Sequence, residues 1–328
     1  RVMPGRRSHP QNPDALSVST WPVTHSYKSK SAETLPPFSP QTIGTDFLAV
    51  QASESGYIPP DCAGAAGPSQ ILVCVNGRIR TFSKSGAADG VLNTTTDNFF
   101  TSVRNNSGTS DPRVIFDRQT QRWFLVMINV STPNRVLIAV SSGATISSAA
   151  SFTFYQFKHD AVGPSPNSDT GGFADFPTLG VDNNALYIGV NVFNGTGTAF
   201  LGSTGFVVRK SSVTGGGPIV VTAFRSLCTA SLPGPYTPQG VSNDNPGATE
   251  GYFIGVDAQQ WGLLQVRRIS SPGGTPTISA NLGINVPATF FPVDVPAKGS
   301  SPLFLDGLDD RLGTAILRNG TLWVAHGI

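Results

Sequence analysis

The chain has 328 residues, of which 13% are charged, with 36 glycines and 26 prolines and a formal net charge of +2. Few lysines and glutamates leave few good helix formers for a surface, and many Gly, Pro, Ser and Asn residues suit a chain rich in turns. The near-neutral charge argues against a nucleic-acid partner. The sequence shows no apolar run long enough for a membrane span.

The first 45 residues differ from the rest. The opening stretch RVMPGRRSHPQNP is rich in proline and arginine and has no apolar period. We therefore expect an irregular N-terminal arm over residues 1–45 and one β domain over 46–328. The absence of a visible signal peptide implies that, if the protein is secreted, this chain is a mature or shortened form.

From about residue 57 a pattern recurs: a polar opening, an apolar strand, a tight turn, a second strand, and then weaker strands. Turn residues such as Asn319-Gly320 between apolar runs are strong hairpin signals. Repeats of 50 to 70 residues indicate a repeated supersecondary unit. Five segments begin in this way, at 57–83, 110–129, 175–193, 237–257 and 308–328.

This repeat predicts an all-β fold, a β-propeller of four-stranded antiparallel blades. Two β-sandwiches in tandem are the competing architecture. The fifth segment ends after its second strand, which leaves two ways to complete the ring. Either the N-terminal segment around 14–50 closes a five-bladed ring, or the chain is part of a six- to seven-bladed one. An unfinished last blade could also pair with a missing C-terminal segment or drive self-assembly.

In a propeller the first strands of all blades converge on a central channel, and their N-terminal ends ring one mouth. Aspartates stand at these openings, so we expect a polar mouth. The ligand-binding prediction covers Asp61, Asp111, Asp175, Asp244, Asp309 and Arg311, with Arg113 and Asn243 nearby. The catalytic candidates among these openings are Asp111, Asp175, Asp310 and Arg311.

Each of these aspartates has an alternative structural role, because an Asp before a strand often caps a turn. We expect this role for Asp117 and Asp182, which lie in hairpin turns. Several carboxylates around one mouth could instead bind Ca²⁺, with Asp111 and Asp175 as ligands. No other cofactor is expected. Three cysteines allow one disulfide, for which Cys62 and Cys74 are the candidates, or three separate thiols.

The stretches PPDCAGAAGP, SDPRVIFDRQTQRWFLVMI and GGFADFPTLGVDNNALYIGVN resemble a group of uncharacterised secreted bacterial propellers. These have a PPD-x-x-GA-x-G opening and D-P-x-V-x-[YF]-D…RW repeats, and they are similar to the sialidase-like propeller superfamily. The resemblance implies a propeller over about 57–328 and an extracellular or cell-surface location. It also favours a shortened chain, since such proteins extend past this C-terminus. It carries no active-site residues here, because the sialidase turn boxes are absent.

Two functions follow from these observations. The first is a non-catalytic extracellular scaffold that binds a glycan or a protein at the cell surface or matrix, which the missing catalytic signature favours. The alternative is a polysaccharide-active glycoside hydrolase or lyase with carboxylates in the funnel, where two carboxyl groups work as a pair. The sequence leaves open whether the protein is an enzyme.

Overall fold

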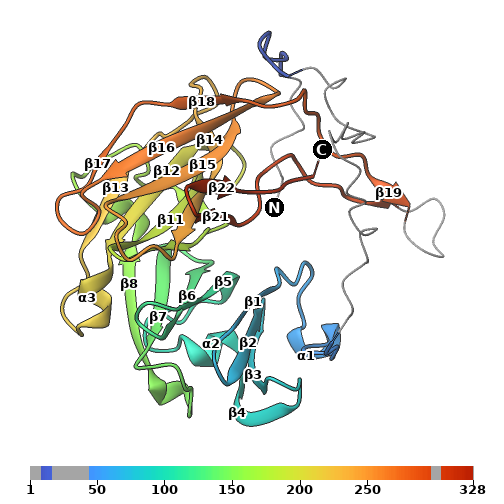
Figure 1. Cartoon of the computed structure of the whole chain (residues 1–328), viewed down its shortest axis with the longest axis vertical. Helices are drawn as coiled ribbons and strands as arrows, with labels where there is room; N and C mark the ends of the chain where they lie inside the picture. Colours follow the sequence, from blue (N-terminus) through green and yellow to red (C-terminus); the bar gives the residue numbers. More distant parts are fainter. Residues whose placement is uncertain (1–8, 17–43, 297–303, 328) are drawn as a thin grey trace, which may run out of the picture.

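A computed structural model describes residues 9–16, 44–296 and 304–327. Nearly all regular structure in these ranges is β-strand, and the sheets follow one another in chain order (Figure 1). The predicted all-β propeller of four-stranded antiparallel blades is confirmed. No helix within the described ranges is long and apolar enough to cross a membrane.

Blades one and two are complete four-stranded antiparallel sheets, each built as a simple meander. One short helix connects them, and another precedes blade one. Blade one consists of β1 (Ala63–Ala66), β2 (Gln70–Val75), β3 (Arg78–Ser83) and β4 (Ala88–Thr94). Blade two consists of β5 (Thr109–Asp117), β6 (Arg122–Asn129), β7 (Arg135–Ser141) and β8 (Phe152–Lys158). The helices here are α1 (Ala52–Ser55), α2 (Thr96–Phe99) and the 3₁₀ turns η2 (Ala149–Ser151) and η3 (His159–Ala161).

Blades three and four keep the same order but break one strand into two pieces. Blade three consists of β9 (Phe173–Asp175), β10 (Gly180–Val181), β11 (Ala185–Phe193), β12 (Phe200–Arg209) and β13 (Val221–Phe224), with α3 (Lys210–Thr214) after β12. Blade four consists of β14 (Pro235–Asn243), β15 (Glu250–Asp257), β16 (Leu263–Ser270), β17 (Thr277–Ile278) and β18 (Leu282–Asn285). Both β9 and β10 pair with β11, and both β17 and β18 pair with β16.

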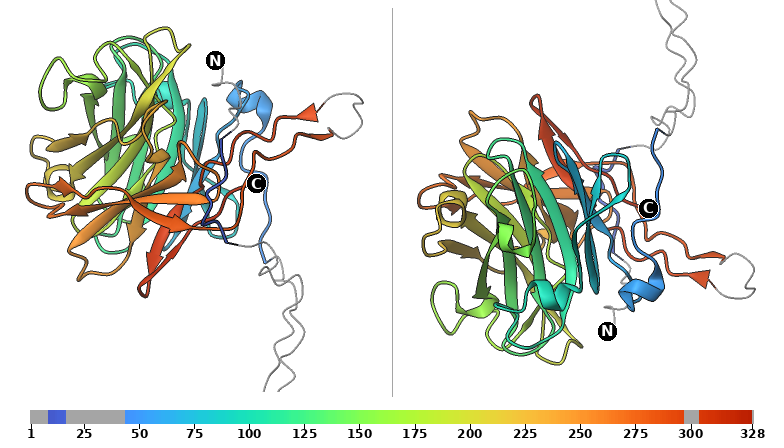
Figure 2. Two further views of the ribbon diagram at one scale, coloured as in Figure 1. Left: turned by 90° about the horizontal axis from the view of Figure 1, so that it is seen from above. Right: turned by 90° about the horizontal axis from the view of Figure 1, so that it is seen from below.

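Blade five has two described strands, β21 (Ala315–Arg318) and β22 (Thr321–Trp323). Strand β21 pairs in parallel with β14 of blade four. A separate hairpin of β19 (Val295–Pro296) and β20 (Phe304–Leu305) projects away from the blades in both Figure 1 and Figure 2. Blade five is thus the short blade that the fifth sequence segment predicted.

The described N-terminal residues pack against other blades. Gln11 and Leu16 form parallel bridges with Trp261 and Pro287, next to blade four. The ring of Phe47 contacts that of Phe82 in blade one, with 4.9 Å between centroids. The parts of the predicted arm that fall on residues 1–8 and 17–43, and the parts of the predicted closing strands that fall on 17–43, lie outside the described residues.

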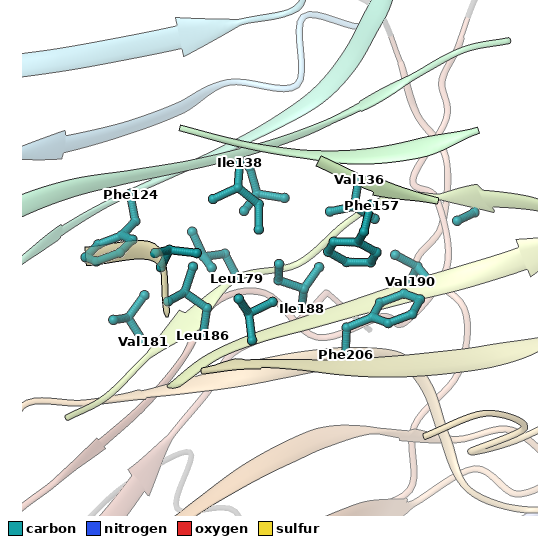
Figure 3. Packing of buried hydrophobic residues seen from close by; sticks show 14 of the residues in the cluster. Phe124, Val136, Ile138, Phe157, Leu179, Val181, Leu186, Ile188, Val190 and Phe206 are labelled. Atoms are coloured by element: carbon teal, nitrogen blue, oxygen red, sulfur yellow. The ribbon is translucent and has the colours of Figure 1, made fainter. Parts of the chain in front are cut away.

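Apolar cores fill the interfaces between neighbouring blades. Figure 3 shows the core between blades two and three, where Phe124 and Ile138 face Leu186 and Ile188. All four of these side chains are fully buried. Stacking buries both faces of each sheet, which one four-stranded sheet cannot do alone, and this burial is the main stabilising contribution.

Blades three and four approach so closely that only glycine fits at several contacts. A Cβ atom on Gly189 of β11 would lie 1.8 Å from the carbonyl oxygen of Pro238 in β14. Substituting Gly189→Ala should therefore separate two backbones and lower the free energy of unfolding by about 2 kcal/mol or more. Urea denaturation of the two proteins measures this difference.

The matched control is Gly143→Ala, because a Cβ atom there meets nothing within 4 Å. Its free energy of unfolding should stay within about 0.5 kcal/mol of the wild-type value or rise slightly. Equal effects of the two substitutions would contradict the close packing of β11 on β14.

Candidate functional site

The innermost strands of blades two, three and four share one irregularity near their N-terminal ends. In each, a residue with left-handed backbone precedes a proline: Asp111 (φ 61°), Phe176 (φ 50°) and Thr237 (φ 46°). The strand register shifts at this step, between Ser110 and Arg113 in β5 and between Tyr236 and Gln239 in β14. Such a bulge bends the strand and redirects its side chains. Asp61 (φ 43°), just before β1, has the same backbone.

The backbone N–H of each bulged residue donates to a polar side chain of the preceding blade. Asn76 Oδ1 accepts from the Asp111 amide at 2.8 Å, and Asp111 Oδ2 accepts from the Phe176 amide at 3.1 Å. Asn191 Oδ1 accepts from the Thr237 amide at 3.2 Å. These bonds bring the strand openings of blades two, three and four to one mouth of the channel.

A cavity of about 330 Å³ lies at the centre of these strands, within the size range of small-molecule sites. Every blade contributes to its wall, including both ends of the row. Because residues before β1 and residues before β21 line the same cavity, the five blades surround it. The lining residues are Cys62, Ala63, Gly64, Arg113, Val114, Ile115, Phe176, Leu179, Gln239, Leu312, Gly313 and Thr314.

Asp61 and Asp111 form a carboxyl pair next to this cavity. Burial, together with the hydrogen bond and charge of Asp111, raises the pKa of Asp61 from 3.8 to about 6. Asp111 accepts from the Ser110 hydroxyl at 2.6 Å and from the Phe176 amide at 3.1 Å. A hydrogen bond between two carboxyl groups needs a proton, so Asp61 carries that proton below about pH 6.

Blade five supplies two further carboxyl groups with opposite pKa shifts. Burial and the neighbouring charge of Asp309 raise the pKa of Asp310 to about 7. Burial acts in the same direction on Asp309, but its bonds to Arg311 outweigh that effect and lower the pKa of Asp309. Arg311 binds Asp309 with two contacts of 2.6 Å, and the Tyr236 hydroxyl adds a third at 3.1 Å.

The ring of Phe176 connects blade five with the carboxyl pair. The guanidinium carbon of Arg113 lies 4.6 Å from the ring centroid, and that of Arg311 lies 4.5 Å from it. Contacts of this kind hold a planar guanidinium in place. The mouth therefore combines carboxyl groups in different protonation states with two arginines and an aromatic face.

The structure brings most of the predicted site residues together. Asp61, Asp111 and Arg113 form one side of the mouth, and Asp309, Asp310 and Arg311 form the other. Asp175 precedes Phe176, and its charge acts on Arg311. The predictions of ligand binding by Asp61, Asp111, Asp175, Asp309 and Arg311 stay predictions.

The predicted position of Asp244 and Asn243 at the mouth is wrong, because both residues lie at the other end of β14. The strand runs from Pro235 to Asn243, so Thr237 and Asp244 are separated by about 23 Å at about 3.3 Å per residue. Asp244 is half-exposed and contacts Arg318 at 3.4 Å. Its place at the mouth is taken by Tyr236 and Thr237.

Sequence analysis missed Phe176, Tyr236 and Asn76. Aligning the openings on the residue before proline, as in Asp111-Pro112, Phe176-Pro177 and Thr237-Pro238, would have placed the first two. Aligning them on aspartate selected Asp175 and Asp244 instead. The sequence Asn76-Gly77 predicts a turn, but it does not indicate that Asn76 contacts Asp111.

Other aspartates have the structural role that their turns predicted. Asp117 accepts from the amide of Thr120 at 3.0 Å, and Asp182 accepts from the amide of Asn184 at 2.7 Å. This confirms the predicted capping. Asp117 also pairs with the buried Lys210 at 2.7 Å, across the interface of blades two and three.

The cysteine and metal predictions have different outcomes. Cys62 is an exposed free thiol, and Cys74 and Cys228 are buried free thiols, so the disulfide between Cys62 and Cys74 is not formed. Within the described ranges there is no group of three or more His, Cys, Asp or Glu side chains that could hold a metal ion. Calcium at Asp111 and Asp175 stays a prediction, and both residues already have interactions within the protein.

No protein-family model and no curated protein matches the chain. It is similar to solved structures. The α-L-arabinanase of Penicillium chrysogenum in complex with arabinobiose is 14% identical, with a TM-score of 0.46 and coverage of 83% of this chain and 77% of that one. The catalytic domain of the Coprinopsis cinerea GH62 α-L-arabinofuranosidase is 13% identical, with a TM-score of 0.38 and coverage of 70% and 69%.

The exo-β-1,3-galactanase of Phanerochaete chrysosporium is 13% identical, with a TM-score of 0.34, and the match spans 68% of this chain and about half (49%) of that one. All three similar proteins are enzymes that act on carbohydrate chains. This finding contradicts the expected non-catalytic scaffold and is better matched by the alternative. Identities this low leave substrate and mechanism to the chemistry of the mouth itself.

The raised pKa of Asp61 makes stability depend on pH. Below about pH 4 the group is protonated in both the folded and the unfolded chain. As the pH rises through about 6, the unfolded chain has already lost a proton that the folded chain still holds, so folding loses stability. Replacing Asp61→Asn keeps a donor toward Asp111 and removes this loss.

We expect the Asp61→Asn protein to be more stable than wild type above pH 6, by on the order of 1 kcal/mol after allowing for the partial exposure of Asp61. The two proteins should be alike near pH 4. Denaturation at both pH values measures the difference, and a variant that is less stable than wild type at pH 8 would contradict the proton-sharing pair.

Proposed function

We propose that this protein is a polysaccharide-active glycoside hydrolase whose reacting groups are Asp61, supported by Asp111, and Asp310. The observation that carries the proposal is two carboxyl groups with raised pKa values, about 6 for Asp61 and about 7 for Asp310, at strand openings next to residues that line the central cavity. Glycoside hydrolysis requires one carboxylic acid and one carboxylate.

The separation assigns the two roles. Asp310, with the higher pKa of the two, holds its proton to a higher pH than Asp61 does. Asp310 then donates a proton to the leaving glycosidic oxygen, and Asp61 acts as the base or nucleophile. Environments that push two pKa values apart are the usual origin of such a division of roles.

The remaining mouth residues support binding rather than bond breaking. Phe176 lies at the cavity wall with the guanidinium groups of Arg113 and Arg311 against its ring, and Arg113 and Gln239 bring N–H groups to the same wall. Small-molecule sites combine apolar walls with a few polar groups in this way. Arg311 holds Asp309 ionised next to Asp310, and the charge of Asp309 keeps the proton on Asp310.

The lyase alternative has less support. A lyase needs a base that removes a proton from carbon, and Tyr236 is the phenol at this mouth. Burial and the charge of Asp309 raise the pKa of Tyr236, so its hydroxyl stays protonated.

An extracellular location and a glycan partner are parts of the same proposal. Polysaccharides outside a cell are too large to cross its membrane unaided, so an enzyme that acts on them must itself be outside. Measuring whether the protein is found in the culture medium or inside the cells that naturally produce it tests this location, and we expect it in the medium.

The decisive experiment is release of reducing ends from a panel of neutral and acidic polysaccharides. Wild type should release sugar with a bell-shaped pH dependence whose limbs lie near 6 and 7. Either Asp61→Asn or Asp310→Asn should reduce the rate by about 100-fold or more, since each removes one proton-transfer group.

Asp244→Asn is the matched control, because it makes the same chemical change at the far end of β14. Its rate should stay within about twofold of wild type. Hydrolysis that survives both Asp61→Asn and Asp310→Asn, or that falls equally in Asp244→Asn, would overturn this assignment.

A further inference from the structure

Asn76 contacts both members of the carboxyl pair, although it belongs to the turn between β2 and β3. Its Nδ2 donates to Asp61 Oδ2 at 2.8 Å, and its Oδ1 accepts from the Asp111 amide at 2.8 Å. Nδ2 also donates to the carbonyl oxygen of Pro59 at 3.1 Å. Asn76 is 6% exposed, so these bonds are shielded from water.

The two arms of the Asn76 amide do different things. The acceptor arm holds the backbone of Asp111 in its left-handed conformation, which places that carboxyl group opposite Asp61. The donor arm occupies Oδ2 of Asp61. A protonated carboxyl group accepts best at its carbonyl oxygen, so the proton of Asp61 belongs on Oδ1 and is available to Asp111.

We propose that Asn76 is a positioning residue for the carboxyl pair, holding Asp61 and Asp111 together and setting how readily Asp61 gives up its proton. The donor arm favours the ionised form of Asp61, so it opposes the effects of burial and of Asp111. Its effect on catalysis rests on the proposed hydrolase function, but its effect on the proton of Asp61 does not.

Asn191 of blade three offers an internal comparison. Its Oδ1 accepts from the Thr237 amide and its Nδ2 donates to Thr237 Oγ1 at 2.8 Å. It therefore supports the next blade's opening as Asn76 does, and it is 2% exposed. Its donor arm meets a hydroxyl where that of Asn76 meets a carboxyl group. Asn191 therefore supports only the opening of the next blade, whereas Asn76 supports the backbone of the next blade and also contacts a carboxyl group that carries a proton.

Charged groups around Asp61 define what else acts on its proton. Asp111 and Arg113, both from β5, face it, and the pKa of Asp61 rises with the first and falls with the second. Arg311 of blade five faces Arg113 across Phe176. The substitution Asn76→Asp leaves all of these in place. It keeps an oxygen for the Asp111 amide and puts an oxygen where the donor was.

The experiment is an NMR titration of the Asp61 side-chain carboxyl carbon in wild type, Asn76→Asp and Asn191→Asp. Loss of the donor arm, together with the carboxyl group that replaces it next to Asp61, should move the Asp61 midpoint upward by about one pH unit or more. In Asn191→Asp the midpoint should move by less than about 0.3 units, although that protein also loses a buried amide donor. The lower limb of the hydrolysis profile should move with the midpoint.

A wild-type measurement covers the case in which Asn76→Asp does not fold. The side-chain amide signals of Asn76 should shift with pH at the midpoint of Asp61, and those of Asn191 should not. An unmoved Asp61 midpoint in folded Asn76→Asp, an equal shift in Asn191→Asp, or Asn76 amide signals that ignore the titration would each overturn the inference. Absence of any hydrolysis in wild type would instead count against the proposed function alone, since the titration needs no substrate.

Discussion

The mouth depends on one repeated interaction, in which the N–H of a bulged residue donates to a side chain of the preceding blade. Asn76, Asp111 and Asn191 are the acceptors for blades two, three and four. A left-handed residue before proline is strained, so it persists only where its surroundings hold it. The bond from each previous blade supplies this restraint, and it links the position of each opening to its neighbour.

Asp111 is the one acceptor in this series that can be charged, and this difference gives the mouth its chemistry. The same carboxyl group restrains the Phe176 backbone and shares a proton with Asp61, so the aromatic ring and the proton are coupled. At the far end of blades two and three, Lys210 joins Asp117 and the carbonyl oxygen of Asp182. The apolar core of Figure 3 lies in this interface. The interface between blades two and three, which positions the mouth residues, is therefore held by polar contacts as well as by its apolar core.

Spacing and turn residues were enough to predict the propeller, because they are local properties that repeat in each blade. Turn sequences such as Asp182-Asn183-Asn184 predicted hairpins directly, because their side chains favour tight turns. The site was predicted only in part, since its geometry depends on the bulge register, which shifts by one residue between openings that look alike. Asp175 and Phe176 illustrate this: the Asp was the chemically obvious residue, but the Phe occupies the position equivalent to Asp111. The contact of Asn76 with Asp111 joins residues 35 positions apart, and nothing in a turn sequence reveals it.

The two proton-transfer groups obtain their different pKa values from different surroundings. Asp61 is partly exposed and forms a carboxyl pair with Asp111, whereas Asp310 is more deeply buried beside Asp309, which Arg311 holds in place. A carboxyl group that faces burial and a negative charge without a compensating donor keeps its proton longest. Asp61 has the Asn76 donor, whereas no side-chain donor reaches Asp310 within the described residues. The deeper burial of Asp310 acts in the same direction, so burial and the missing donor together give Asp310 the higher pKa. In the proposed hydrolase, the Asn76 amide in the turn between β2 and β3 is therefore one of the groups that keeps the pKa of Asp61 below that of Asp310.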